Sequence, residues 1–439
     1  MKKVDTLIIG GGISGLSAAH FLNKRKIDFL LLESSNTLGG VIRTQTHKHF
    51  IFENGPNTVL NNNSSIQMLV NDCELKDKMI FPEISSNSKR YVFHNNHPVA
   101  APLNIKEFFK TPLIPLSSKF KILWELISPF QFQNTTVYNF FTLKLGKKFH
   151  DNLIEPFLTG IYAGNTKKMS IKHCFRNLWL FKKKYKIILI GLITSMKKRS
   201  LSFTFKNGLH ELIKILEINL RDKIELNSSV ELIKKNGNQY EIVTNTRKTF
   251  LCKNVISTIP SFSLSKIMFD DNLRSILKKI DYNPIDVFHL VFKKDDIKNK
   301  LNGFGILCKP SDKKKYLGII FNSKIFPHVC SPDYDLFTVL VGGEKQKDIL
   351  KIPKGDLKKI IVNEVKDLFN CSGDLVYSNY FRWEKAIPQY NLIHDELGKS
   401  ISNFQKKYNN FKIIGNYFSG VSVSDCIQKS ELVVKELYD

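Results

Sequence analysis

The hydrophobic pattern at the start of the chain predicts a strand, a helix and a second strand. Residues 4–9 (VDTLII) and 29–32 (FLLL) are short apolar runs rich in branched side chains, which is typical of buried parallel strands. Between them, residues 16–25 (LSAAHFLNKR) place apolar side chains at helical spacing. The segments therefore predict one strand–helix–strand unit.

Farther along the chain the pattern changes twice. Residues 266–384 alternate apolar, strand-like runs with loops, which predicts an antiparallel sheet. Residues 95–199 are helical in pattern and rich in Phe, Leu and Ile, and their stretches 106–130 and 181–199 have amphipathic spacing. Such a helix either packs on a core or lies in a membrane interface, and amphipathicity alone does not separate the two.

Composition excludes several classes of protein. The chain has 439 residues, of which 42% are hydrophobic, so it is globular and long enough for about two or three domains. Its longest strongly apolar stretch, 187–193, is far shorter than the ~20 residues of a membrane-spanning helix. A strand already begins at Val4, which leaves no room for a signal peptide. Seven dispersed cysteines without a CxxC pair indicate reduced thiols. We therefore expect a cytoplasmic location.

The net charge of +26 has two interpretations. It can mark a basic face that binds anionic lipid, nucleic acid or an acidic substrate. It can also reflect a chain crowded with Lys, Asn, Ile and Phe, which we favour as the source of most of the charge. No nucleic-acid-binding module is recognisable, so that partner is discounted.

A glycine-rich turn joins the first strand to the helix. Residues 10–15 (GGGISG) form a GxGxxG sequence in the strand-to-helix position where it binds a dinucleotide. Gly10 permits the tight turn, Gly12 lets the backbone approach a pyrophosphate, and Gly15 lets helix and strand pack closely. The phosphates would lie at the N-terminus of the helix. Glu33, after the second strand, can accept hydrogen bonds from an adenosine ribose.

Further motifs follow in a fixed order. They are residues 38–44 (LGGVIRT), 52–58 (FENGPNT), 155–165 (EPFLTGIYAGN), 381–390 (FRWEKAIPQY) and 413–427 (IIGNYFSGVSVSDCI). In this order the chain resembles the flavin amine oxidase and phytoene desaturase superfamily, and within it the porphyrinogen oxidase branch. Segments 205–216, 224–230 and 255–260 look like the superfamily's glycine–helix element, the strand that follows it and the returning strand of its FAD domain, so the resemblance covers essentially the whole chain.

The resemblance implies an α/β fold with three parts. The first is a Rossmann-like, discontinuous FAD-binding domain, which we place at residues 1–80, 200–265 and 385–439. The second is an antiparallel-sheet substrate-binding domain at 81–94 and 266–384. The third is a helical membrane-associating domain at 95–199.

The resemblance also implies a reaction: FAD-dependent removal of six electrons from protoporphyrinogen IX to give protoporphyrin IX in heme biosynthesis, with dioxygen as acceptor. Oxidation of coproporphyrinogen III to coproporphyrin III by the same fold is the alternative. A flavin amine oxidase or carotenoid desaturase is more distant, because neither is expected to combine GIYAGN with the DCI ending. A basic, membrane-binding protein that keeps FAD without catalysis is the non-enzymatic alternative.

Site residues are assigned by the same resemblance. No acid–base catalytic residue is expected, because the flavin carries the chemistry, and no metal site is expected. The expected cofactor-binding residues are Gly10, Gly11, Gly12, Ile13, Ser14, Gly15, Glu33, Ser34, Gly40, Arg43, Gly55, Pro56, Asn57, Thr58, Val230, Trp383, Gly415, Asn416, Val421, Ser422 and Val423. The expected substrate-binding residues are Asn57, Gly160, Ala163, Phe304, Leu307 and Leu340. Some members carry an arginine after the Gly-Pro turn to meet a propionate; this chain has Asn57, so the carboxylate partner stays open.

Partners also follow from the resemblance. We expect a porphyrinogen, dioxygen and peripheral contact with the inner face of the cell membrane. A homodimer and hand-over of product to the next heme-pathway enzyme are left open.

Overall fold

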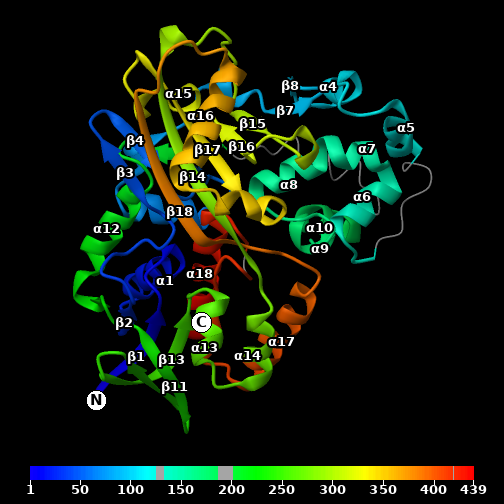
Figure 1. Cartoon of the computed structure of the whole chain (residues 1–439). Coiled ribbons are helices and arrows are strands. Elements are labelled where there is room, and N and C mark those ends of the chain that lie inside the picture. Colours follow the sequence, from blue (N-terminus) through cyan, green and yellow to red (C-terminus); the bar gives the residue numbers. More distant parts are fainter. Residues whose placement is uncertain (125–132, 186–200, 419) are drawn as a thin grey trace.

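Two large sheets and a helical segment make up the protein (Figure 1). The computed structural model describes residues 1–124, 133–185, 201–418 and 420–439. The α/β class with mixed sheets is confirmed. None of the helices in these ranges is long and apolar enough to cross a membrane. Membrane association of the helical segment stays a prediction.

The first sheet contains the predicted parallel strands. Its order is β10-β2-β1-β13-β12-β11, with β19 paired to β13. The strands are β1 (Lys2–Ile9), β2 (Phe29–Leu32), β10 (Ile224–Glu225), β11 (Val230–Asn236), β12 (Gln239–Thr244), β13 (Thr249–Ser257) and β19 (Phe411–Ile413). β10, β2, β1, β13 and β19 are parallel, whereas β11 and β12 add an antiparallel edge.

The prediction of one strand in this sheet is wrong. Residues 224–230 do not form a single strand, because β10 ends at Glu225 and β11 begins at Val230. Asn227 between them has φ of 53°, in the left-handed region where a strand cannot continue. Val230 nevertheless packs in the core of this sheet, beside the strands β1 and β2.

Helices cover both faces of the first sheet. One face carries α1 (Ile13–Lys24), α2 (Ser64–Asp72), α12 (His210–Leu220) and α18 (Val423–Tyr438). The other face carries α13 (Ser261–Ile267), α14 (Asp271–Lys278) and α17 (His394–Lys407). Strand β2 lies between the two layers of helices and contains only apolar residues, as is typical of a strand that is covered on both faces. Helix α14 thus packs on the FAD-domain sheet, although we expected the substrate domain to begin at residue 266.

The second sheet has the order β18-β14-β17-β16-β15-β7-β8. Its strands are β7 (Tyr91–His94), β8 (His97–Ala100), β14 (Tyr282–Lys293), β15 (Gly305–Leu307), β16 (Gly318–Ile320), β17 (Tyr334–Gly342) and β18 (Tyr377–Pro388). All pairs are antiparallel except β15 with β7. Helix α16 (Lys354–Phe369) packs its buried face on this sheet. The sheet extends to Ala100, past the expected start of the helical segment at residue 95.

The helical segment lies beside the second sheet (Figure 1). Its helices are α4 (Ile105–Lys110), α5 (Leu116–Trp124), α6 (Val137–Leu145), α7 (Lys147–Phe149), the π-helix η2 (His150–Ile154), α8 (Glu155–Tyr162), α9 (Ile171–Cys174) and α10 (Arg176–Tyr185). The amphipathic stretch 106–130 is broken after Lys110, because Pro112 and Pro115 cannot continue a helix. Residues 186–199 of the second expected amphipathic stretch lie outside the described residues.

Smaller elements connect these parts. They are the hairpin β3 (Thr44–His47) and β4 (Phe50–Glu53), the three-stranded sheet of β5 (Val59–Leu60), β9 (Ser202–Phe205) and β6 (Met79–Ile80), and the short helices α3 (Ile84–Asn87) and α15 (Asn322–Ile325). Single turns of tighter helix include η5 (Pro310–Asp312), and η7 (Glu344–Lys351) is longer.

Candidate FAD-binding site

Parallel strands of the first sheet end at the same level. Ile9, the last residue of β1, is in register with Leu32 of β2 and with Ser257 of β13. Ser257 is in turn in register with Ile413 of β19. We call this carboxyl-terminal edge the cofactor edge, because ligands of open α/β sheets bind outside the carboxyl ends of the strands.

Three expected cofactor segments begin at the cofactor edge. They are the 10–15 turn after β1, Glu33 after β2, and the segment from Gly415 after β19. Thr258, the residue after β13, donates its hydroxyl to the carbonyl oxygens of Ile9 and Gly10 at 2.9 and 3.1 Å, which ties the turn to the edge. Residues separated by four hundred positions in sequence thus meet at one edge.

The 10–15 turn has the shape of a cradle for phosphates. Gly10 has φ of 106°, which favours glycine. A Cβ added at Gly15 would lie 1.8 Å from the Gly10 carbonyl oxygen, so only glycine allows α1 to start here. A Cβ at Gly12 would meet nothing within 4 Å, so Gly12 faces open space at the N-terminus of α1. These residues fit a dinucleotide pyrophosphate.

Glu33 lies beside this turn. Its Oε2 accepts a hydrogen bond from the Gly11 N–H at 2.6 Å, and its Oε1 accepts from the Ser35 N–H at 2.8 Å and from the Ser34 hydroxyl at 3.1 Å. The Ser35 hydroxyl also donates to Oε1 at 2.9 Å, so Oε1 is fully used and the acceptor capacity that remains for a ribose hydroxyl is on Oε2. Val230 is near, since the Ser228 N–H donates to the Glu33 carbonyl oxygen at 2.8 Å.

Arg43 and Trp383, which are 340 positions apart in the numbering, lie together. The Arg43 guanidinium carbon is 5.3 Å from the centre of the Trp383 ring, within range of a cation–π contact. Arg43 Nε donates to the Gly40 carbonyl oxygen at 3.2 Å, and Trp383 Nε1 donates to that of Asn54 at 2.6 Å. The GGVIR and FRW motifs therefore lie next to each other, and Trp383 contacts the turn that contains Gly55.

The Gly55-Pro56 turn requires its glycine. A Cβ at Gly55 would lie 1.8 Å from the Val41 carbonyl oxygen. The next side chain, Asn57, accepts a hydrogen bond from Asn322 Nδ2 at 2.9 Å and donates weakly to the Gly55 carbonyl oxygen at 3.3 Å. Pro56, Asn57 and Thr58 are all partly exposed.

The last cofactor segment leads into α18. Gly415 has φ of 145°, and Ser422 caps the helix by accepting a hydrogen bond from the Asp425 N–H at 3.1 Å. Asp425 lies within the first turn of the helix and not at its cap. The helix begins at Val423, and the dipole at the N-terminus of the helix favours negative charge nearby. Burial raises the pKa of Cys426 to about 11, so it stays a thiol.

The expected substrate residues do not all lie together. Gly160 of α8 lies against Leu307 of β15, since a Cβ on Gly160 would be 2.4 Å from Leu307 Cδ2. Ala163 and Leu340 share an apolar cluster that also includes Trp383. Phe304 packs elsewhere, with the β4 phenylalanines Phe50 and Phe52.

Leu317 belongs to the group of Ala163 and Leu340, and sequence reasoning missed it. It lies one strand away from Leu340, and its N–H donates to the Leu340 carbonyl oxygen at 2.7 Å. Its place in the apolar run LGIIF (residues 317–321) could have marked it as buried. We call Leu307, Leu317 and Leu340 the leucine wall.

The Ala163 carbonyl oxygen, which we considered as a substrate contact, is already occupied. It accepts hydrogen bonds from Asn283 Nδ2 at 2.9 Å and from the Glu344 N–H at 2.8 Å. These use the two lone pairs of the oxygen. Ala163 ends α8 in the left-handed conformation, at φ of 50°, and the two bonds hold it there.

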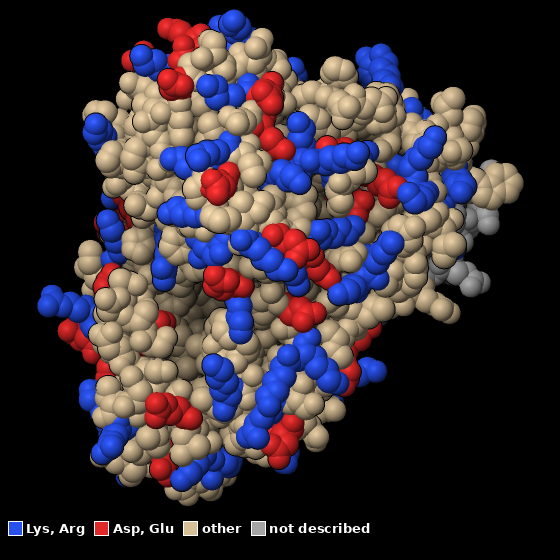
Figure 2. Space-filling model, in the orientation of Figure 1, with Lys and Arg blue, Asp and Glu red and all other residues tan. Residues whose placement is uncertain are grey.

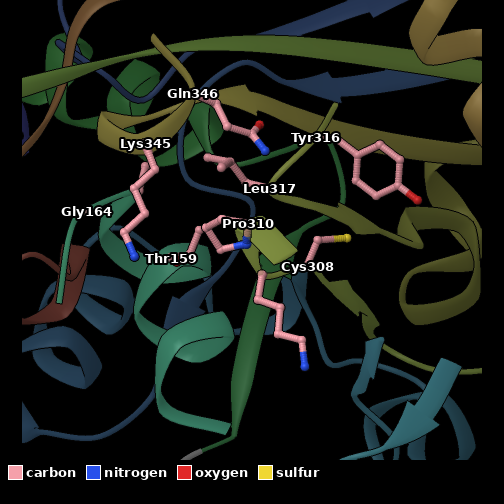
Figure 3. A pocket seen from close by; sticks show the side chains of 10 residues that line it. Thr159, Gly164, Cys308, Pro310, Tyr316, Leu317, Lys345 and Gln346 are labelled. Atoms are coloured by element: carbon pink, nitrogen blue, oxygen red, sulfur yellow. The ribbon is translucent and has the colours of Figure 1, made fainter. Parts of the chain in front are cut away.

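A small cavity that is partly open to solvent lies beside Leu317 of the leucine wall (Figure 3). Its lining includes Thr159 and Gly164 from the α8 region, Leu317, and Lys345 and Gln346 from η7. The cavity lies at the junction of α8, the second sheet and η7. It adjoins Ala163 and is therefore close to the expected substrate residues.

One cluster in the described residues resembles a metal site. His150, Asp151 and Glu155 place ligand atoms within 4.8 Å of one another. The carboxylates are already paired, Asp151 with Lys147 at 2.7 Å and Glu155 with Lys345. His150 Nε2 is hydrogen-bonded to the Thr166 hydroxyl at 3.0 Å. The cluster is an ion-pair network that joins α8 to η7.

Comparison with known proteins matches residues 13–437 to the family of flavin containing amine oxidoreductases. The chain belongs to this family. It is therefore an FAD-dependent oxidoreductase, and the expectations of family and cofactor are confirmed.

Similar proteins are known within this amine oxidoreductase family. The chain is 26% identical to a mitochondrial protoporphyrinogen oxidase of Nicotiana tabacum, with 98% of this chain and 94% of the relative covered. It is 25% identical to a coproporphyrinogen III oxidase of Bacillus subtilis, with 99% and 98% covered. A solved structure from Exiguobacterium sp. 255-15, described as a candidate protoporphyrinogen oxidase, has the same fold, with a TM-score of 0.84, 20% identity, and 100% and 99% covered.

Bound FAD supplies two-electron redox chemistry in such an oxidoreductase. The chain's own residues would bind and orient it. The 10–15 turn and the α1 N-terminus would hold the phosphates, and Glu33 would accept from the ribose. Arg43, Trp383 and the Gly55 turn would border the flavin ring system. The assignment of individual residues to FAD stays a prediction.

Glu53 is the titratable group of the FExGP motif, and it is buried. Burial raises its pKa to about 8, against the opposing effect of hydrogen bonds from the Leu209 N–H (2.7 Å) and the Thr44 hydroxyl (2.9 Å). The neighbouring His289 donates Nε2–H to the Glu53 carbonyl oxygen at 3.1 Å, and burial lowers the pKa of His289 to about 4. At pH 7, therefore, both side chains are mainly neutral.

Substitution of Gly12 separates cofactor binding from folding. We expect Gly12→Ala to fold normally, because its Cβ meets no protein atom, and to lose FAD affinity by about tenfold or more, because the methyl group would occupy the path of the pyrophosphate. Gly398→Ala in α17 is the matched control, since its Cβ also meets nothing within 4 Å. The measurement is flavin fluorescence titration of the apoprotein. Equal FAD affinity in both variants would remove Gly12 from the site.

Because burial raises the pKa of Glu53, we expect the stability of the folded protein to depend on pH. A carboxyl whose pKa is raised on folding binds its proton more tightly in the native state, so stability falls as pH rises from about 4.5 to about 8. We expect Glu53→Gln to remove a loss of about 4 kcal/mol across this range in urea unfolding. Glu231→Gln, on the exposed face of β11, is the control and should keep the wild-type pH profile. Parallel profiles in all three proteins would mean that Glu53 is ionised in the native state.

Proposed function

We propose that this oxidoreductase converts protoporphyrinogen IX to protoporphyrin IX in heme biosynthesis, with dioxygen as the terminal acceptor. The observation that carries the proposal is similarity over almost the whole chain to relatives that are named for porphyrinogen oxidation. The GIYAGN and DCI motifs of the sequence also support it; they lie at the end of α8 and in the first turns of α18.

The reaction balances as three two-electron oxidations. The porphyrinogen loses six hydrogen atoms, and three dioxygen molecules take them up as three molecules of hydrogen peroxide. The protein has to hold a flat, largely apolar macrocycle and keep water away from it. The leucine wall and the apolar cluster around Ala163 and Trp383 supply such a surface.

Coproporphyrinogen III is the second candidate substrate, because relatives named coproporphyrinogen III oxidase match over the same length. It carries four propionates, whereas protoporphyrinogen IX carries two. Asn57 provides no positive charge after the Gly-Pro turn, and its amide oxygen is bound to Asn322. Fewer carboxylates to neutralise and an apolar leucine wall favour protoporphyrinogen IX.

Initial rates of porphyrin fluorescence with both porphyrinogens, side by side, test the substrate. We expect a clear preference for protoporphyrinogen IX in kcat/KM. Leu340→Asn should lower kcat/KM by about tenfold or more, since a polar amide then faces the macrocycle, while Leu232→Asn on the exposed face of β11 should not. A preference for coproporphyrinogen III would overturn the choice of substrate. An unreduced flavin with both compounds under nitrogen would overturn porphyrinogen oxidation altogether.

We also propose that the helical segment makes the protein a peripheral membrane protein, at the inner face of the cell membrane. Helices α4 and α5 expose large apolar side chains between lysines. The exposed residues are Ile105, Phe109, Leu116, Phe120, Leu123 and Trp124. Basic side chains are otherwise spread over the visible face rather than gathered in one patch (Figure 2), so apolar insertion supported by nearby lysines is the proposed mode of contact.

Liposome flotation tests this contact. We expect the protein to float with vesicles that contain anionic lipid, more strongly at low salt than at high salt. Phe120→Ser combined with Trp124→Ser should abolish flotation, because these side chains are 68% and 63% exposed on α5. Ile84→Ser combined with Ile218→Ser removes equally exposed apolar side chains (87% and 68%) outside the helical segment and should float normally. Flotation of all variants alike, or of none, would contradict the proposal.

A further inference from the structure

A buried tyrosine closes the last turn of the cofactor edge. Tyr390, which follows β18 and is 5% exposed, donates its hydroxyl hydrogen to the Asn416 carbonyl oxygen at 2.6 Å. The same hydroxyl oxygen accepts a hydrogen bond from the Gly420 N–H at 3.0 Å. One side chain thus joins both ends of the segment that leads from β19 to α18.

A second buried ring, that of His394, packs against Tyr390. Its ring stacks on His394, with 4.5 Å between the ring centres and 18° between the planes. His394 donates Nε2–H to the Tyr417 carbonyl oxygen at 3.0 Å, in the middle of the same turn. Burial lowers the pKa of His394 to about 4, so at neutral pH the ring is uncharged and carries its one proton on Nε2. Three backbone groups of the turn are therefore bound by two stacked rings.

The two rings are also connected to the helical segment. The Tyr390 carbonyl oxygen accepts a hydrogen bond from the Ser170 N–H at 2.9 Å. Asp395, next to His394, accepts from Lys172 Nζ at 2.5 Å and from His173 Nε2 at 2.9 Å. Although burial opposes it, these hydrogen bonds lower the pKa of Asp395 to about 2, so the contact persists at any physiological pH.

We propose that Tyr390 is a positioning residue for FAD: with His394 it fixes the backbone of Asn416, Tyr417 and Gly420 and so the direction of the N–H groups at the start of α18. These N–H groups follow the segment that begins at the cofactor edge, where the helix N-terminus would stabilise negative charge on a bound flavin. The inference rests on FAD binding by this family and is independent of which substrate is oxidised.

Tyr390→Phe tests the role of the hydroxyl, since it keeps the ring stacked on His394 and removes both hydrogen bonds to the turn. We expect the FAD dissociation constant of the apoprotein to rise about tenfold, as the loss of two hydrogen bonds predicts. We also expect the visible absorption band of the bound flavin to shift. His394→Phe keeps a ring but loses only the bond to Tyr417, so its effect should be smaller, about threefold.

Tyr240→Phe is the matched control. Tyr240 is equally buried and its hydroxyl donates to Asn410 Oδ1 at 2.9 Å, but it pairs with Cys252, toward the opposite end of β13 from the cofactor edge. It should lower the melting temperature of the apoprotein and leave FAD affinity and the flavin spectrum unchanged. The rise in melting temperature on adding FAD should be reduced only in Tyr390→Phe and His394→Phe. If Tyr390→Phe lowers stability as Tyr240→Phe does, with FAD affinity and spectrum of the wild type, then Tyr390 has only a structural role and the proposal is wrong.

Discussion

The register of the parallel strands is the constraint on which the rest of the structure depends. Because Ile9, Leu32, Ser257 and Ile413 end at one level, the residues that follow them are forced into the same small region. Because helices cover both faces of the sheet, a shift of one residue in any of these pairs would exchange the side chains that pack against the two helical layers, so packing on both faces fixes the register. The dinucleotide cradle is thus a consequence of packing the sheet between two layers of helices.

The same constraint explains why motifs far apart in sequence act together. Trp383 reaches the cofactor region from the second sheet and is fixed by its hydrogen bond to the Asn54 carbonyl oxygen. Gln389 donates to the Tyr162 carbonyl oxygen at 2.8 Å, and Tyr390 binds the backbone of Asn416 and Gly420. The segment from Trp383 to His394 therefore contacts the FExGP turn, the end of α8 and the last cofactor turn in succession. It is the physical link between the cofactor edge, the leucine wall and the helical segment.

Sequence reasoning correctly predicted the elements whose residues allow few backbone conformations. The β2 strand was predicted with its observed ends, and the glycine turn was found because Gly10 and Gly15 have backbone geometries that no larger residue accepts. It failed where a single residue redirects the chain, as at Asn227, which divides an expected strand, and at Pro112, which ends α4. It also missed Leu317 and Tyr390, because their roles come from neighbours on other elements. No spacing in the sequence encodes the stacking of Tyr390 on His394.

The charge distribution around the expected flavin position follows from burial rather than from composition. The chain as a whole carries +26, yet at pH 7 the buried groups nearest the cofactor segments are neutral: Glu53 because its pKa is about 8, and His289 and His394 because their pKa values are about 4. Arg43, beside Trp383, is a cation that the cofactor motifs contribute. An oxidation that passes electrons and hydrogen from an apolar substrate to a flavin needs a dry surface and a well-placed cofactor more than it needs acids and bases. The interactions in this region therefore stabilise the backbone geometry of the cofactor segments. Glycines leave space for close approach of the backbone, and buried aromatic rings pack on the turns and hydrogen-bond to them.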